Sequence, residues 1–239
     1  MRNAPKSAAA KSGPAKSGSV KPKRRAAGRP PPAAKPYHHG DLRRVLIDAA
    51  SELVEQGGAE AVSVREAARR AGVSPGAPFR HFPSRDALMM AVAEEAQRRF
   101  RAEIDAALAT APARDPLARF RCFGLAYLRW ATRNPAHFEI ISSGRLFDHD
   151  SAAALSQDNA ELIDMTGLML ADASAQGQLR PLDLKQVRLA ARALVYGFAR
   201  MNIDGHFPRW GVADAEAERA AEAIIDLFID GIAARSVPT

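Results

Sequence analysis

Apolar residues recur at the spacing of an amphipathic helix along nearly the whole chain from residue 42 onward. Between Leu42 and Val54 they follow one another at intervals of three and four residues, which gathers them on one helix face. No stretch of the sequence shows convincing alternation of apolar and polar positions, the pattern of a half-buried β-strand. The sequence therefore predicts an all-α fold, whose first helix ends at Gly57-Gly58.

The next residues predict a second, short helix with defined ends. Ser63-Val64-Arg65-Glu66 has the form of a capping box. In such a box the Ser63 hydroxyl accepts a hydrogen bond from the amide of residue 66, and Glu66 reaches back to the amide of residue 63. Gly72 is expected to end this helix, because glycine adopts a positive φ without strain.

A third helix is predicted over about residues 75–81, since Ser74-Pro75 supplies an N-cap and a proline in the first turn. Pro78 lacks the amide that would give this helix its first internal hydrogen bond. We therefore expect a short and partly irregular element. Phe79 and Phe82 are expected to pack inward.

Two short helices joined by a tight, glycine-containing turn are typical of a helix-turn-helix. An element over residues 75–81 would be ~10 Å long, and the major groove of DNA is ~12 Å wide. Its exposed face would offer small side chains and two larger polar ones: Ser74, Gly76, Ala77, Arg80 and His81. This segment is the strongest indication of function in the sequence.

Beyond Phe82, capping residues, prolines and glycines predict only further helices. They are expected at about residues 84–111, 115–134, 135–142, 151–175, 183–204 and 214–234. The sequence thus divides into a helix-turn-helix head over residues 37–83 and a helical bundle over residues 84–239.

Two groups of apolar residues in this bundle allow more than one interpretation. The last two helices carry broad apolar stripes, which fit either an intramolecular core or a four-helix bundle shared by two subunits. The large aromatic and methionine side chains of the middle helices fit either a core or an apolar ligand cleft. The ligand-binding candidates are Phe123, Tyr127, Trp130, His137, Phe138, Met165, Met169 and Tyr196.

Charge is distributed unevenly along the chain. Residues 1–36 hold ten Lys and Arg and no acidic residue, whereas the formal net charge of the whole chain is +7. This stretch is rich in Ala, Ser, Gly and Pro and lacks apolar periodicity, so we expect a disordered basic arm. Residues 37–90 carry seven basic and seven acidic residues. The head therefore cannot attract DNA by its net charge alone.

Residues 38–90 resemble the DNA-binding domain of TetR-family transcriptional repressors. The resemblance is carried by Gly40-Asp41-Leu42, by Ala49-Ala50-Ser51-Glu52-Leu53, and above all by the run from Ala68 to Phe82, ARRAGVSPGAPFRHF. Residues 126–138 also resemble a TetR-type C-terminal domain named for a Trp-His-Gly motif. In the place of that motif this chain has Val195-Tyr196-Gly197.

The resemblance implies a homodimeric bacterial repressor that binds a pseudo-palindromic double-stranded DNA operator and is released by a small-molecule effector. Dimerisation would use the last two helices, and the location would be the cytoplasm, at the nucleoid. Carried over by position, the DNA-binding residues are Ser63, Arg65, Ser74, Pro75, Gly76, Ala77, Phe79, Arg80, His81 and Arg85. Phe79 stands where the family usually has tyrosine, so the phenolic contact with phosphate is absent at this position.

Arms that precede helix-turn-helix domains can enter the adjacent minor groove, and we expect Lys21–Arg29 to do so. Two other classes of function remain open: a non-specific architectural DNA-binding protein and an α-helical enzyme. The sequence disfavours an enzyme, since His38-His39 lack metal-ligand spacing and Cys122 lies in apolar company. No cofactor or metal is expected. No membrane contact is expected either, because no apolar run approaches the ~20 residues of a membrane span.

Overall fold

The computed structural model describes residues 42–142 and 153–234. The chain divides into two units, residues 1–36 and 37–239, and all the described residues belong to the second unit. The predictions for the basic arm, for Lys21–Arg29 and for His38-His39 lie outside the described residues. So does the start of the helix expected from residue 151.

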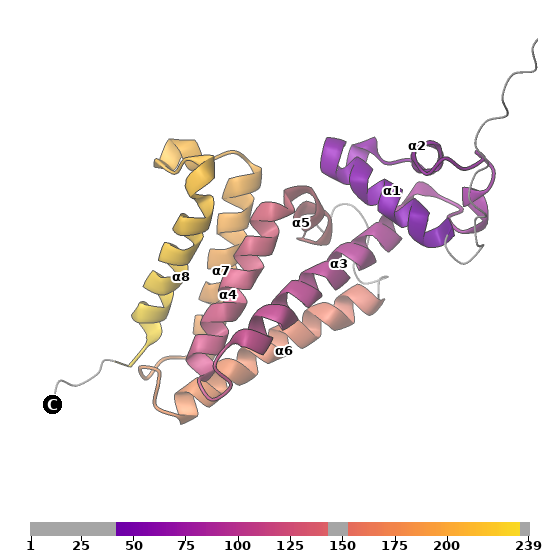
Figure 1. Ribbon diagram of the computed structural model, residues 1–239. Helices are drawn as coiled ribbons and strands as arrows, with labels where there is room; N and C mark the ends of the chain where they lie inside the picture. The colour runs from indigo at the N-terminus through magenta and orange to yellow at the C-terminus, as the bar shows by residue number, and fades with distance from the viewer. Residues whose placement is uncertain (1–41, 143–152, 235–239) are drawn as a thin grey trace, which may run out of the picture. The chain divides into compact units, whose positions relative to one another are not determined.

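The described residues form eight α-helices and no strand, which confirms the all-α prediction (Figure 1). The helices are α1 (Leu42–Gly57), α2 (Val64–Arg70), α3 (Arg85–Thr110), α4 (Pro116–Arg133), α5 (Pro135–Ser142), α6 (Ala153–Ala175), α7 (Leu184–Ile203) and α8 (Ala217–Ile232). Within the described ranges, β-structure is limited to one isolated antiparallel bridge between Leu179 and Ala233.

Ser63 and Ser84 cap the starts of α2 and α3, whereas the N-cap predicted for Ser74 is not formed, because the 3₁₀-helix that follows begins only at Pro78 and has no side-chain cap. The Ser63 hydroxyl accepts from the Glu66 amide at 3.1 Å, and the Ser84 hydroxyl accepts from the Ala87 amide at 3.1 Å. The return bond predicted for the Glu66 carboxylate is replaced, because that carboxylate accepts from Arg69 Nε at 2.9 Å. Gly72 has a φ of +68°, as expected for the end of α2.

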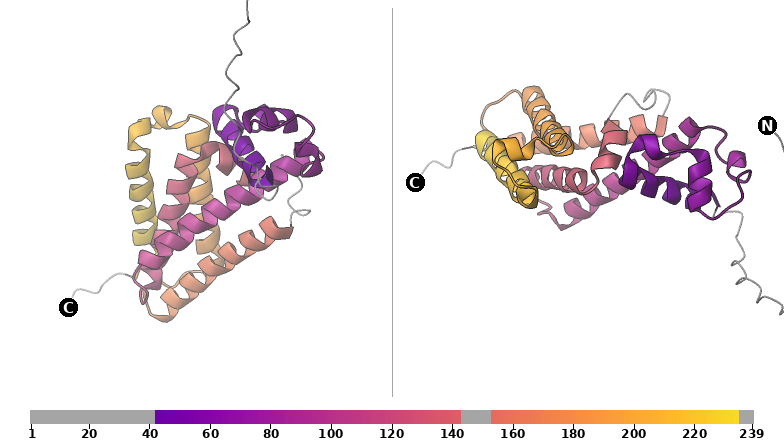
Figure 2. Two further views of the ribbon diagram at one scale, coloured as in Figure 1. Left: turned by 45° about the vertical axis from the view of Figure 1, so that its right-hand side comes forward. Right: turned by 90° about the horizontal axis from the view of Figure 1, so that it is seen from above.

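Two hydrophobic cores organise these helices, and α3 belongs to both. In the head, α1 and α2 bury apolar side chains against the first half of α3, including Leu88 and Val92. In the body, α4 contacts α3, α6, α7 and α8, and the second half of α3 contributes Phe100 and Ile104. Helices α4, α7 and α8 run side by side (Figures 1 and 2). The head core therefore continues past residue 84, where the sequence pattern places the boundary.

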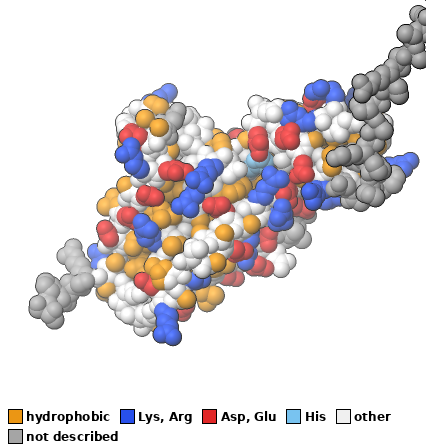
Figure 3. All heavy atoms as spheres, in the orientation of Figure 1, with side chains coloured by type: hydrophobic (Ala, Val, Ile, Leu, Met, Phe, Trp, Pro, Cys, Tyr) orange, Lys and Arg blue, Asp and Glu red, His pale blue; other side chains and the backbone are white. Residues whose placement is uncertain are grey.

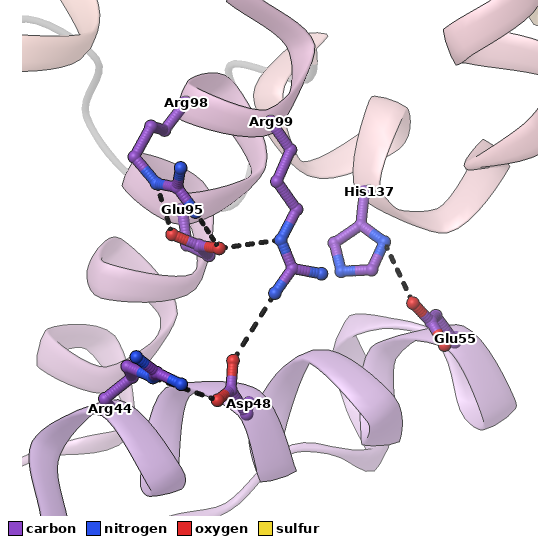
Figure 4. Close-up of polar contacts among 7 residues, drawn as sticks. All are labelled: Arg44, Asp48, Glu55, Glu95, Arg98, Arg99 and His137. Carbon is purple, nitrogen blue, oxygen red and sulfur yellow. Dashed lines mark hydrogen bonds and ion pairs between the residues drawn. The ribbon is translucent and has the colours of Figure 1, made fainter. Parts of the chain in front are cut away.

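Helix α5 also joins the two cores. Ile140 is buried in the head core, whereas Phe138, two residues earlier, is buried in the body core. His137, which directly precedes Phe138, is 3% exposed on a helix that contacts both α1 and α3. Its Nδ1 lies 3.9 Å from Oε1 of Glu55 on α1 (Figure 4). A single turn of α5 thus touches both parts of the protein.

Ion pairs surround His137 at this junction. Arg99 of α3 donates to Glu95 at 2.7 Å and to Asp48 of α1 at 3.4 Å, as Figure 4 shows. Burial lowers the pKa of His137, and Arg99 acts in the same direction, while Glu55 and Glu95 oppose them. The Nε2 atom of His137 is buried without a hydrogen-bond partner in the described structure. Burial at this junction therefore favours the neutral form of the imidazole.

Replacing Trp130 by alanine is expected to destabilise the body core. Trp130 is 6% exposed and its ring lies 5.1 Å from that of Phe100. Loss of a buried tryptophan should lower the free energy of unfolding by about 3–5 kcal/mol, measured by urea denaturation. The control is Trp210→Ala, since Trp210 is 74% exposed and should change stability by less than about 0.5 kcal/mol. Equal effects of both substitutions would contradict this account of the core.

Replacing His137 by glutamine should reduce the acid sensitivity of folding. Because the folded state binds this proton less tightly than the unfolded chain, stability is lost as pH falls through about 6.5 toward the lower folded pKa. The urea midpoint of His137→Gln should therefore fall less between pH 7.5 and pH 5.5 than that of the unmodified protein. His206→Gln, which alters an exposed histidine outside this junction, is the control substitution. An unaltered pH profile in His137→Gln would refute the prediction.

Candidate DNA-binding surface and ligand cavity

The segment after α2 forms turns rather than a regular α-helix. The Ala77 amide donates to the Ser74 carbonyl at 3.1 Å, and a 3₁₀-helix, η2, then spans Pro78–Arg80. Of the helix predicted over residues 75–81, only Pro78–Arg80 is helical, and it is a 3₁₀-helix. The expectation that this element is short and partly irregular is confirmed. The missing amide of Pro78 explains this result, because an α-helix would need that donor.

The irregular turn also decides which side chains face inward. Phe82 is 2% exposed, as predicted, but Phe79 is 44% exposed, so the prediction that Phe79 packs inward is wrong. Pro78 is fully buried in the head. A 3₁₀-helix has three residues per turn instead of 3.6, which changes the directions of its side chains. In this turn Pro78 is the residue that points into the head core, and Phe79 points to solvent.

The predicted DNA-binding residues lie on the solvent-facing side of the helix-turn-helix. The structure exposes eight of them and leaves Ala77 and Arg85 half-buried; the exposed ones are Ser63, Arg65, Ser74, Pro75, Gly76, Phe79, Arg80 and His81. Helix α2 contacts η2, so the start of α2 and the turn segment belong to one packed unit. The small side chains of the turn leave its backbone accessible.

Four of the seven arginines of residues 37–90 are held by acidic side chains in the described structure, whereas Arg43, Arg65 and Arg80 are not; the Arg43 guanidinium lies over the Phe82 ring at 5.5 Å. Arg69 pairs with Glu66, and Arg70 pairs with Glu52 at 3.3 Å. Arg65 and Arg80 make no ion pair with any residue in the described part of the chain. The head has no net charge, yet two of its three unneutralised guanidinium groups, those of Arg65 and Arg80, are exposed on the helix-turn-helix.

Arg85 is held by the backbone of the head. Its Nε donates to the Val62 carbonyl at 3.1 Å, and an Nη atom donates to the Ala59 carbonyl at 2.8 Å. These bonds tie the start of α3 to the turn before α2. The phosphate contact predicted for Arg85 stays a prediction, and the structure gives this guanidinium a structural role in addition.

A cavity of about 330 Å³ lies in the body between α3, α4, α6, α7 and α8. Its inner wall is aromatic and aliphatic, including Phe100, Phe120 and Ile225. Ile163 and Leu189 also line it and are 44% and 70% exposed, so the cavity opens to solvent between α6 and α7. Size and apolar lining match those of small-molecule sites in proteins. On the face shown in Figure 3, hydrophobic side chains are exposed over the C-terminal helices, interspersed with both basic and acidic side chains.

Of the eight predicted ligand-binding residues, Phe123 and Tyr127 line this cavity and six do not. Trp130, Phe138 and Met169 are buried in the body core, and Met165 packs against it. His137 lies at the junction with α1, and Tyr196 is 37% exposed on α7. Helical spacing identifies inward-facing residues, but it does not distinguish those that border a gap from those that fill the core.

Three cations of α7 line the cavity and were not among the sequence candidates: Lys185, Arg188 and Arg192. A signal for them exists in the sequence, because they follow one another at intervals of three and four on one face of a mostly apolar helix. Lys185 is also the one lysine of the chain outside residues 1–36.

Arg192 connects the cavity to the aromatic residues beneath it. Its guanidinium donates to the Tyr127 hydroxyl and lies 5.4 Å and 5.2 Å from the ring centres of Tyr127 and Tyr196. Burial raises the pKa of Tyr127, and Arg192 partly opposes this shift. The Tyr127 ring in turn packs edge-on against Phe138 of α5 at 5.7 Å.

The described residues contain no group of three or more His, Cys, Asp or Glu side chains that could hold a metal ion. Among the helices of the two described ranges, none is both long and apolar enough to span a membrane.

Comparison with known proteins adds two family matches and two curated relatives. Residues 46–92 match the family described as bacterial regulatory proteins, tetR family, and residues 120–228 match the tetracyclin repressor-like C-terminal domain. An HTH-type transcriptional repressor KstR of Rhodococcus jostii is 34% identical over 125 residues, 52% of this chain and 57% of the relative. The KstR repressor of Mycobacterium tuberculosis is 32% identical over 139 residues, 58% of this chain and 60% of the relative.

Solved structures share the fold along most of the chain. A protein of unknown function from Rhodococcus sp. RHA1 is 30% identical, covers 84% of this chain and 100% of its own, and has a TM-score of 0.67. The ketosteroid transcriptional regulator KstR2 of Mycobacterium tuberculosis, 18% identical, covers 81% of this chain and 96% of its own, with a TM-score of 0.62.

The match to the curated repressors spans less than two thirds of their length. The Trp-His-Gly type of C-terminal domain stays a prediction, since the matched domain is described more generally. The head and the body nevertheless match the two domains of one family in the order expected, around a helix-turn-helix that exposes eight of its ten predicted DNA-binding residues. The chain belongs to the TetR family of bacterial regulatory proteins.

Proposed function

We propose that this protein is a homodimeric transcriptional repressor of the bacterial cytoplasm that binds a pseudo-palindromic operator and is released by a small molecule. The observation that carries the proposal is the pair of unneutralised arginines, Arg65 and Arg80, on an exposed helix-turn-helix. Phosphate contacts would position the head, and Arg65 at the start of α2 would reach a base edge. The curated repressors that it resembles support the direction of regulation.

The proposed domain organisation is a basic arm over residues 1–36, a DNA-binding head over residues 37–83 and a body over residues 84–239. The arm would add phosphate or minor-groove contacts that the neutral head lacks. An architectural protein that binds DNA without sequence preference is the alternative, and the arm is the feature that favours it.

The outer faces of α7 and α8 are the proposed dimer interface. The stripes expected from the sequence turn inward: Val187, Val195 and Ile225 are buried in the chain's own core. Large apolar side chains stay exposed on the outer faces, at Leu189 and Tyr196 of α7, which are seven residues apart, and at Leu227 of α8. Four such helices from two subunits would form a bundle. Two heads could then contact half-sites about 34 Å apart.

Release by a ligand requires that the cavity and the head share a rigid element. Helix α3 lines the cavity with Phe100 and contributes Leu88 to the head core. The dimer would have two conformations that differ in the distance between its two DNA-binding heads. A ligand that binds one conformation more tightly would shift the population toward that conformation, with a coupling free energy of typically ~1–3 kcal/mol. Leu189 borders both the cavity and the proposed dimer face, so ligand binding would also bear on the subunit interface.

The proposal is tested by a nuclease footprint on the DNA that flanks the protein's own gene. A short protected palindrome is expected, and Arg65→Ala should weaken binding to it by about 1–3 kcal/mol or change its base preference. Arg69→Ala is the matched control, because it removes the same charge from the same helix at a side chain already held by Glu66. Equal affinity for every duplex sequence would instead establish the architectural alternative.

Leu227→Glu should convert the dimer to a monomer, since it places a charge in the proposed subunit interface. Sedimentation velocity at micromolar concentration is the measurement. Because Leu227 is 74% exposed within one chain, the melting temperature of the monomer should be little changed. Leu168→Glu, at an α6 position that is 65% exposed, should remain dimeric. A dimeric Leu227→Glu protein would rule out this interface.

A further inference from the structure

The mouth of the cavity concentrates positive charge that nothing in the described structure neutralises. Lys185, Arg188 and Arg192 line it, and none of the three makes an ion pair within the described ranges. The lining residues include no Asp or Glu. Like charges at intervals of three and four residues on one helix face repel one another, and an apolar wall beside them strengthens the field they produce.

Other arginines that bridge two helices of the body form ion pairs with carboxylates. Arg101 joins α3 to α6 through Glu161 at 3.0 Å, and Arg133 joins α4 to α8 through Glu218 at 2.9 Å. Arg200 of α7 pairs with Glu139 of α5 at 3.6 Å. Each of these guanidinium groups has a carboxylate from the chain itself. The three cations at the cavity mouth have none.

Arg188 is placed to meet a bound molecule. A Cβ atom at Gly167 of α6 would lie 3.0 Å from an Nη atom of Arg188, so the bare glycine leaves room for the guanidinium between α7 and α6. Thr166 and Asn159 of α6 line the same mouth and can add hydrogen bonds. Cations and polar groups thus lie at the opening, while the aromatic residues Phe100 and Phe120 lie on the inner wall.

We propose that the cavity binds an amphipathic anion, with its apolar body on the aromatic wall and its carboxylate, sulfonate or phosphate at Arg188 and Lys185. This inference rests on the proposed function, because it names the chemical class of the effector. A neutral molecule would leave the three cations unpaired, and a cationic one would be repelled. Arg192, bonded to Tyr127, would link the bound anion to the aromatic contacts that lead to α5.

Two fluorescent probes of one scaffold test the proposal on the full chain without DNA. The anion 8-anilinonaphthalene-1-sulfonate should bind at least about tenfold more tightly than N-phenyl-1-naphthylamine, which lacks the sulfonate. Arg188→Gln should bring the affinity for the anion to within about twofold of that for the neutral probe and leave the neutral probe unaffected. Arg188→Lys keeps the charge and should retain most of the preference. Arg114→Gln removes an exposed arginine outside the cavity and should change neither affinity.

Displacement then identifies the anionic group and the site. Dodecanoate and dodecyl phosphate should displace the anionic probe at lower concentration than dodecanol, and the order of the first two distinguishes a carboxylate from a phosphate. Ile163→Trp, which narrows the mouth, should weaken both probes about tenfold or more.

The outcomes separate this inference from the proposed function. Equal affinities for the two probes, both weakened by Ile163→Trp but unaffected by Arg188→Gln, would overturn the anion proposal and leave the cavity as a ligand site. If neither probe binds, or Ile163→Trp affects neither, both the ligand site and its chemical class are overturned. The operator footprint is an independent measurement, so a failure to bind DNA would not be confused with either result.

Discussion

The arrangement of this protein depends on one helix that is buried at both ends in different cores. The first half of α3 places Leu88, Met89 and Val92 in the head core, and the second half places Phe100 and Ile104 in the body core. A 26-residue helix extends about 39 Å, and close-packed cores resist gradual deformation. In the proposed mechanism, the second half of α3 therefore cannot be displaced without moving the DNA-binding head.

Helix α5 provides a second, shorter connection between the same two cores. Its Phe138 packs against Tyr127, which lines the cavity, and its His137 faces Glu55 of α1. The contacts run without a gap from the cavity wall to the first helix of the head. Two rigid connections constrain the head more strongly than one, because a single helix could pivot about its contacts. A ligand in the cavity would thus contact residues that belong to α3 or pack against α5, the two connections to the head.

Local charge pairing explains how a head without net charge can present a cationic surface. Arg69 and Arg70 are neutralised by Glu66 and Glu52, whereas Arg65 and Arg80 are left unpaired in the described structure. The cavity mouth follows the same principle, since its arginines and lysine lack carboxylate partners that comparable residues of the body have. In both places the charges that the chain leaves unpaired mark the surface on which a partner is proposed to bind.

The sequence by itself determined the helices and their ends, because these depend on residues close together in the chain. Ser63, Gly72 and Ser84 act within one turn of their own positions, and Pro78 shortens its helix by lacking its own amide. The residues of the helix-turn-helix were predictable for the same reason. Only the tertiary structure decided that Phe79 faces solvent, that Trp130 fills the core, and that Lys185, Arg188 and Arg192 border a cavity. Those outcomes depend on which helices pack against one another and on where their packing leaves a gap. The spacing of apolar residues within one helix gives no information about either.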